Sequence, residues 1–201
     1  MTVLTYMSPL IALLTLLTAS PLQARVASIE FSNLVATSDL IVVARVESVS
    51  APLILGKKYA KAKVIEVWKG LPIEQVKFLA SPTWTCDISE AVKGETVLLF
   101  LNKRDQSQAY SIAHSGRGRW PLRIVGGNEY ATFWPDVILP KDVATIAGPE
   151  SKFDFIRSVK LDTLRDLTKR SLAASLPVAI IEQWINAHPR FDSGAQFHRS
   201  S

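Results

Sequence analysis

The sequence predicts a mainly β protein: a small antiparallel β-barrel with a short N-terminal helix and C-terminal helices packed on it. Segments rich in β-branched residues, separated by turn residues, fill the chain from residue 40 to about residue 134. Several of these segments alternate apolar and polar residues, as strands with one buried face do. After Pro140 the apolar spacing changes to that of a helix. Short strands followed by helices favour a barrel with helices on one side.

The first 24 residues differ from the rest because they contain no charged side chain. Their apolar run, residues 10–17, is too short to span a bilayer as a helix, and small or turn-forming residues follow it up to Ala24. This pattern is typical of a secretory signal, although the usual positive region before the apolar run is missing and a retained anchor helix stays open. We therefore expect a cleaved signal peptide, a periplasmic or secreted protein, and no transmembrane segment after cleavage.

The first elements of the mature chain are a short helix and a long strand. Ser32 is a suitable N-cap for a helix over residues 33–37. Residues 40–49 are rich in valine and isoleucine, which favours a strand. Alternation along this strand predicts one inward face, formed by Leu40, Val42, Ala44 and Val46.

Further strands follow at short intervals. The stronger candidates are residues 59–68, 75–80 and 95–101, and the weaker ones are residues 109–113, 120–125 and 130–134. Alanine and lysine alternate at the start of the 59–68 strand, so one face there is expected to be exposed to solvent. In the next strand Val76, Phe78 and Ala80 are expected to point inward. Apolar residues on both faces of residues 95–101 indicate a central strand that is covered on both sides.

The C-terminal part is expected to be helical. One helix is predicted by the spacing of Leu161, Leu164, Leu167 and Leu172, and a second by the stripe of Val178, Ile181, Trp184 and Ile185. The chain is therefore divided into a signal peptide (1–24), a barrel domain (25–140), a helical appendage (141–190) and a disordered tail (191–201).

Composition excludes some functions. The chain has 23 Lys and Arg against 18 Asp and Glu, a modest positive excess that suits an anionic partner but mostly concerns solubility. Cys86 is the only cysteine, so no internal disulfide is possible. A buried thiol is the simplest role for Cys86, and a nucleophile with His114 as its base is the alternative. One cysteine and three scattered histidines do not supply a metal site, and no metal or cofactor is expected.

A basic and aromatic segment, residues 114–123, is the main candidate for ligand binding. Two glycines free its backbone, and three arginines offer forked donors for an anionic group. The predicted ligand-binding residues are Arg117, Arg119, Trp120 and Arg123, together with Trp84 on a neighbouring connection. The alternative is a surface hairpin whose arginines pair with Glu90, Asp105 or Glu129 while Trp120 lies in the core.

Several strings occur in a familiar order: LVATSDLIVVARVESV, AKVIEVWKGLP, VKFLASPTWTC, GETVLLFL and SGRGRWPL. In this the chain resembles uncharacterised exported bacterial proteins that are similar to the netrin-module superfamily, whose best-known members are the tissue inhibitors of metalloproteinases. The resemblance covers about residues 28–123 and implies a barrel of the oligonucleotide/oligosaccharide-binding (OB) type. In the tissue inhibitors an N-terminal cysteine reaches the protease metal. Here Arg25 begins the expected mature chain and no cysteine lies near it, so protease inhibition is not carried over.

The sequence therefore predicts a non-enzymatic binding or interaction module, with an anionic envelope ligand or a protein as its partner and no nucleic acid. Two alternatives stay open. One is an enzyme that uses Cys86 as its nucleophile. The other is an envelope structural protein whose helices after Pro140 dock on a partner.

Overall fold

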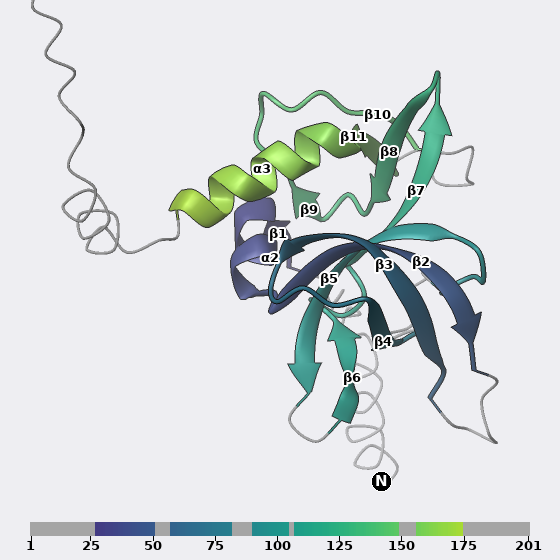
Figure 1. Cartoon of the computed structure of the whole chain (residues 1–201). Coiled ribbons are helices and arrows are strands. Elements are labelled where there is room, and N and C mark those ends of the chain that lie inside the picture. The colour runs from purple at the N-terminus through teal and green to yellow at the C-terminus, as the bar shows by residue number, and fades with distance from the viewer. Residues whose placement is uncertain (1–26, 51–56, 82–89, 105–106, 149–155, 175–201) are drawn as a thin grey trace, which may run out of the picture.

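The computed structural model describes residues 27–50, 57–81, 90–104, 107–148 and 156–174. Figure 1 shows a barrel with a second layer of strands and helices packed against one side. In chain order the described elements are β1 (Ile29–Glu30), α2 (Phe31–Thr37), β2 (Leu40–Val49), β3 (Tyr59–Lys69), β4 (Gln75–Leu79), β5 (Thr96–Arg104), β6 (Ser107–Ile112), β7 (Arg119–Val125), β8 (Asn128–Phe133), β9 (Val137–Ile138), β10 (Ile146–Ala147), β11 (Arg157–Lys160) and α3 (Leu161–Ala174).

Five strands close the barrel, and this confirms the predicted mainly β fold. Their spatial order is β2-β3-β4-β6-β5, and β5 pairs back onto β2. Neighbours run antiparallel except β4 and β6, which are parallel where Phe78 is the register partner of Tyr110. The sheet continues outside the barrel from β5 through β7, β8 and β11 to β10.

The barrel interior is a packed apolar core. The predicted alternation along β2 is confirmed, since its inward residues are all buried there. The inward residues of β4, Val76 and Phe78, are buried in the same core, and Ala80 follows them. Because apolar side chains fill the interior, a ligand site has to be sought on the outside of the barrel or at its ends.

A second core lies between the barrel and the outer layer. The outward side chains of β2 and β5, such as Ile41, Val43 and Phe100, pack there against α2, α3 and the β7–β8 hairpin. The predicted central strand at residues 95–101 is therefore confirmed as covered on both faces. Trp120 occupies the middle of this second core, with its ring 5.0–5.9 Å from the rings of Phe31, Phe100 and Phe133.

β6 and β7 run one after the other along the same edge of β5. Residues 113–118 bulge out between them, opposite Phe100. The amide of Phe100 donates to the carbonyl of Gly118 (2.7 Å), and its carbonyl accepts from the amide of Ala113 (2.9 Å). A Cβ at residue 118 would lie 2.6 Å from the carbonyl oxygen of Phe100, so this close approach requires glycine.

Two local predictions need correction. The first helix begins at Phe31 rather than after Ser32, because the Phe31 side chain, only 2% exposed, packs into the second core and extends the helix. The chain after Pro140 is not helical alone: β10 and β11 add strands beside β8 before α3 begins. The helix predicted from Leu161 is confirmed as α3.

The predicted signal peptide, second C-terminal helix and tail lie outside the described residues. Within the described ranges, no helix is long and apolar enough to cross a membrane.

Candidate functional site

The predicted arginine segment folds into the interior. Arg117 is 7% exposed; its Nε pairs with a carboxylate oxygen of Asp136, and it donates to the carbonyl of His114 (3.0 Å). Arg119 is 3% exposed and donates to both carboxylate oxygens of Glu95. Trp120 is fully buried and donates from Nε1 to the carbonyl of Arg117 (2.6 Å). These side chains hold the second layer together and do not present forked donors to solvent.

Arg123 is the other predicted ligand-binding residue that the structure describes. Arg123 is half-buried and donates to the carbonyl of Ala147, which ties β7 to β10. Trp84 and Cys86 lie outside the described residues. The surface-hairpin alternative paired the arginines with Glu90, Asp105 or Glu129. In the structure Arg117 pairs with Asp136 and Arg119 with Glu95, while Glu90 pairs with Lys58 (2.8 Å).

His114 lies within hydrogen-bond distance of a side chain of α2. Its Nε2 lies 2.9 Å from the hydroxyl of Thr37, which links the 113–118 bulge to α2. Burial, and then the nearby charge of Arg117, lower the pKa of the imidazole below its ordinary value. The described residues contain no cluster of His, Cys, Asp and Glu able to hold a metal ion.

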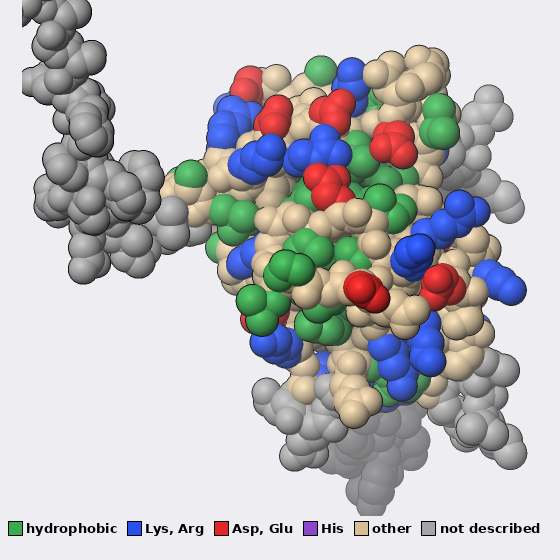
Figure 2. Space-filling view, viewed as in Figure 1, with side chains coloured by type: hydrophobic (Ala, Val, Ile, Leu, Met, Phe, Trp, Pro, Cys, Tyr) green, Lys and Arg blue, Asp and Glu red, His purple; other side chains and the backbone are tan. Residues whose placement is uncertain are grey.

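Cations gather on the part of the barrel that the second layer leaves uncovered. Figure 2 shows Lys and Arg side chains over the lower right of the molecule, where Figure 1 places the β2–β3 hairpin. Arg45, Lys61, Lys63 and Lys77 are all exposed. They alternate with buried residues on β2, β3 and β4, so they share the outer face.

The strand register sets like charges directly opposite each other. Lys61 of β3 is the partner of Lys77 of β4, and Lys63 of β3 is the partner of Arg45 of β2. Each such pair costs about 0.2–1 kcal/mol relative to a neutral pair. Among the described residues no carboxylate lies within ion-pair distance of these four cations. The four cations therefore repel one another, and a bound anion would reduce this repulsion.

A hollow of about 290 Å³ adjoins the Lys61–Lys77 pair. We call it the lysine hollow; its lining residues are Ser48, Val49, Ser50, Tyr59, Lys61 and Lys77. The Nζ of Lys77 lies 5.1 Å from the centre of the Tyr59 ring, which orients this ammonium group over the ring. The backbone amide of Tyr59 donates to the hydroxyl of Ser50 (2.8 Å). Two ammonium groups and two hydroxyls without an acidic neighbour in the lining suit an anionic group.

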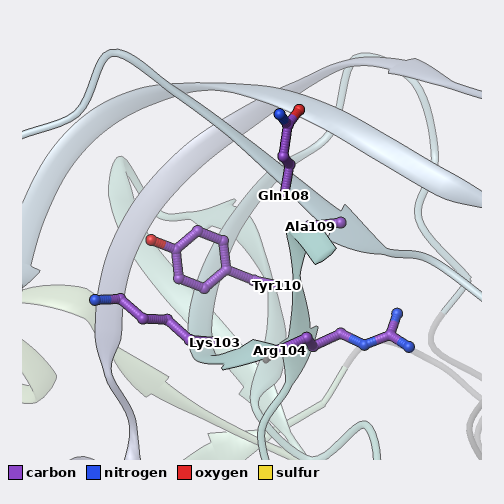
Figure 3. Close-up of a pocket in the computed structure, with 5 residues that line it drawn as sticks. All are labelled: Lys103, Arg104, Gln108, Ala109 and Tyr110. Carbon is purple, nitrogen blue, oxygen red and sulfur yellow. The ribbon is translucent and has the colours of Figure 1, made fainter. Parts of the chain in front are cut away.

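A second hollow, of about 240 Å³, is lined by residues at the end of β5 and in β6. Lys103, Arg104, Gln108, Ala109 and Tyr110 line it. Figure 3 shows the charged ends of Lys103 and Arg104 pointing to opposite sides, so they do not converge on one ligand atom. The lysine hollow is therefore the better candidate.

The alternation of alanine and lysine in β3 predicts an exposed face, as observed, but it does not locate the lysine hollow. Lysines at residues 61 and 77 are brought together only by the pairing of β3 with β4. The alternation Lys61-Ala62-Lys63 was the available sign of a cationic face on β3. It points to the hollow only when the register that pairs Lys61 with Lys77 is known.

No protein-family model matches the chain, and neither does any curated protein sequence.

Proposed function

We propose that this protein is an exported, non-enzymatic binding module that recognises an anionic ligand at the lysine hollow. The observation that carries the proposal is the Lys61–Lys77 pair, which the register holds side by side with no acidic partner among the described residues. The hydroxyls of Ser48 and Ser50 complete a lining that can both neutralise and orient an anionic group.

The strand order supports the same location. A closed five-stranded barrel in the order first-second-third-fifth-fourth, with the third and fifth strands parallel, is the arrangement we assign to an OB-fold. Barrels of this class bind ligands on the face of the second and third strands, which here are β3 and β4. The assignment also agrees with the resemblance to the netrin-module superfamily. Export rests on the signal-like pattern of residues 1–24.

Residue-resolved NMR titration with inorganic sulfate and with inorganic phosphate tests the proposal. We expect the largest amide shift changes at residues 48–50, 59–61 and 77, with saturable binding in the millimolar range that weakens as salt rises. The double variant Lys61→Gln and Lys77→Gln should lose these changes, because both ammonium groups are gone.

The matched control is Lys141→Gln with Lys169→Gln, which removes the same charge from two exposed positions outside the hollow. It should leave the titration unchanged. The hollow variant should be as stable as the original protein or more stable by up to about 1 kcal/mol, since a like-charge pair is removed. Equal loss of binding in both variants, or no saturable shift at the hollow, contradicts the proposal.

A further inference from the structure

The lysine hollow is one end of a longer cationic surface. β2, β3 and β4 present a grid of outward-facing register partners: Arg45, Lys63 and Gln75 form one row, and Ser48, Lys61 and Lys77 form the next. Four of these side chains are cations and two are neutral hydrogen-bonding groups. Each lysine of β3 therefore has one cationic and one neutral partner. The exposed carboxylate of Glu47 lies between the two rows on β2, at the register shift between Val46 and Ser48, so the four cations outnumber it on this face.

The four cations form a continuous path, which we call the cation track, in the order Arg45, Lys63, Lys61 and Lys77. It crosses from β2 to β3, follows β3 for two residues and crosses to β4. Strand spacing and rise give a length of roughly 16 Å when it is followed from Cα to Cα along the path, and roughly 12 Å in a straight line between the Cα atoms of Arg45 and Lys77. One sulfate, phosphate or carboxylate group neutralises only one end of such a path. A ligand that relieves the whole track has to carry several anionic groups in line.

The neutral groups on the grid distinguish among linear polyanions. Ser48 and Gln75 offer hydroxyl and amide groups between the cations, which suits a chain that carries hydroxyls of its own. Nucleic acids bind such faces mainly by stacking bases on exposed aromatic rings. Among the residues that the structure describes, Tyr59 is the only aromatic residue lining the lysine hollow, and Lys77 lies over its ring. The grid itself contains no aromatic side chain.

We propose that the ligand is a linear acidic polysaccharide that follows the cation track, with one of its anionic groups seated in the lysine hollow. This inference rests on the proposed function for the hollow and adds the Arg45–Lys63 pair as a second contact site. Affinity should therefore grow with chain length, because binding at the hollow raises the effective concentration of the next anionic group at Arg45 and Lys63.

The test uses the full chain and heparin-derived oligosaccharides as probes, a disaccharide and a longer oligosaccharide, measured by isothermal titration calorimetry. We expect the longer chain to bind at least about tenfold more tightly than the disaccharide. Arg45→Gln with Lys63→Gln should remove most of that gain, and should weaken disaccharide binding much less than Lys61→Gln with Lys77→Gln does. Lys61→Gln with Lys77→Gln should weaken both probes. The control pair Lys141→Gln and Lys169→Gln should alter neither.

The outcomes separate this inference from the proposed function. If the longer chain gains nothing, or if Arg45→Gln with Lys63→Gln leaves that gain intact, the track is wrong while the hollow still stands on its own titration. If no anion binds through Lys61 and Lys77, the proposed function fails as well. A single-stranded oligonucleotide of equal charge that binds more tightly than the longer heparin chain overturns the choice of polysaccharide.

Discussion

The buried arginines show how single charged residues stabilise this fold. Glu95, directly before β5, accepts from Arg119 and also from the backbone amide of Val92 (2.7 Å). Arg119 is 3% exposed, so its guanidinium has exchanged water for this carboxylate. A buried ion pair stabilises a protein little compared with apolar residues, but breaking one leaves an uncompensated charge, which is costly.

Arg119→Ala should lower the free energy of unfolding by about 3 kcal/mol, because the Glu95 carboxylate loses its charged partner. Chemical denaturation measures the change. The double variant with Glu95→Ala should lose clearly less than the two single changes added together. Strict additivity contradicts a direct ion pair. Arg170→Ala, an exposed position on α3, should stay within about 0.5 kcal/mol of the original protein.

Whether the arginines of residues 114–123 are exposed or buried could not be predicted from the sequence. An exposed basic loop and a buried one have the same local composition. The partners that decide between them, Asp136 and Glu95, lie 19 and 24 residues away in sequence. Glycines and arginines in alternation indicated an unusual backbone, and the structure confirms that part: His114, Ser115 and Gly116 all have positive φ.

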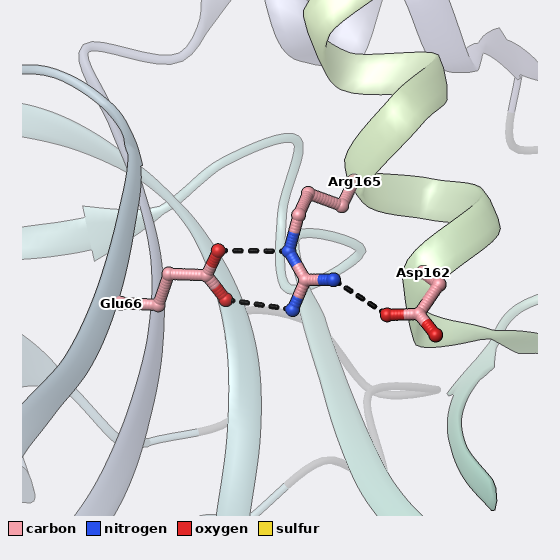
Figure 4. A network of polar contacts seen from close by, with 3 residues as sticks. All are labelled: Glu66, Asp162 and Arg165. Atoms are coloured by element: carbon pink, nitrogen blue, oxygen red, sulfur yellow. Dashed lines mark hydrogen bonds and ion pairs between the residues drawn. The ribbon is translucent and has the colours of Figure 1, made fainter.

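Among the elements, α3 shows how an appended helix is fixed to a barrel. Its buried leucines enter the second core. On its outer side Arg165 donates from two nitrogens to the carboxylate of Glu66 on β3 (2.8 and 2.9 Å) and from a third to Asp162, as Figure 4 shows. The guanidinium also lies 5.7 Å from the centre of the Trp68 ring. Helix and strand are thus joined by a forked ion pair beside an aromatic ring.

The Glu66–Arg165 pair should make stability depend on acid pH. The hydrogen bond from Arg165 holds the pKa of Glu66 below its ordinary value. A carboxylate with a depressed pKa in the folded state stabilises the protein at neutral pH and loses that contribution as pH falls through the folded-state pKa. Glu66→Gln should therefore lower Tm at about pH 7 and have little effect near pH 3.

Thermal unfolding followed by circular dichroism measures the difference in Tm between the original protein and Glu66→Gln at each pH. The effect should be small, because the pair is partly exposed and screened by solvent. An equal loss of Tm at both pH values means that Glu66 acts through packing alone. High salt should reduce the difference at neutral pH.

Elements with a long periodic pattern were predictable. Alternation identified the barrel strands, and leucine spacing identified α3. β9, β10 and β11 were missed because two to four residues are too few to show a period. The start of α2 was missed because packing of Phe31, rather than a side-chain cap, sets it.

In the whole molecule, two cores share two strands. β2 and β5 send alternate side chains into the barrel and into the second core, so each core forms one face of the same pair of strands. The second core also takes Val159 from β11 and leucines from α3. Cores joined in this way are expected to unfold in one cooperative transition. We therefore expect the barrel and the layer that contains α3 to fold as one unit.

Removal of residues 150–201 tests this dependence. The shortened chain loses β11 and α3, which uncovers Ala131, Phe133 and the rest of the second core. We expect it to aggregate or to bind a hydrophobic dye, as exposed apolar surface does. Leu164→Ala in the full chain is the milder counterpart and should cost about 2–5 kcal/mol. A soluble shortened chain with unchanged stability contradicts the shared-core description.

The topology is the part that sequence patterns reach least. The parallel pairing of β4 with β6 and the closure of β5 onto β2 are contacts between distant segments, and no local period encodes them. The cation track depends on the same non-local register. This is why a barrel with covered central strands could be predicted from the sequence, while the position of its best candidate site could not.

The bulge of residues 113–118, opposite Phe100, has positions that differ in how well they should accept a change of sequence. The backbone of Phe100 holds two strands at once. Its carbonyl binds Ala113 directly after β6, the strand that closes the barrel, and its amide binds Gly118 directly before β7, the first strand of the outer hairpin. Ser115 is exposed at the outer turn of the bulge, so we expect an inserted residue there to leave both hydrogen bonds of Phe100 in place. A side chain at residue 118 would collide with the carbonyl of Phe100 and weaken the attachment of both β6 and β7, so we expect substitution of Gly118 to be far more damaging than a change at Ser115.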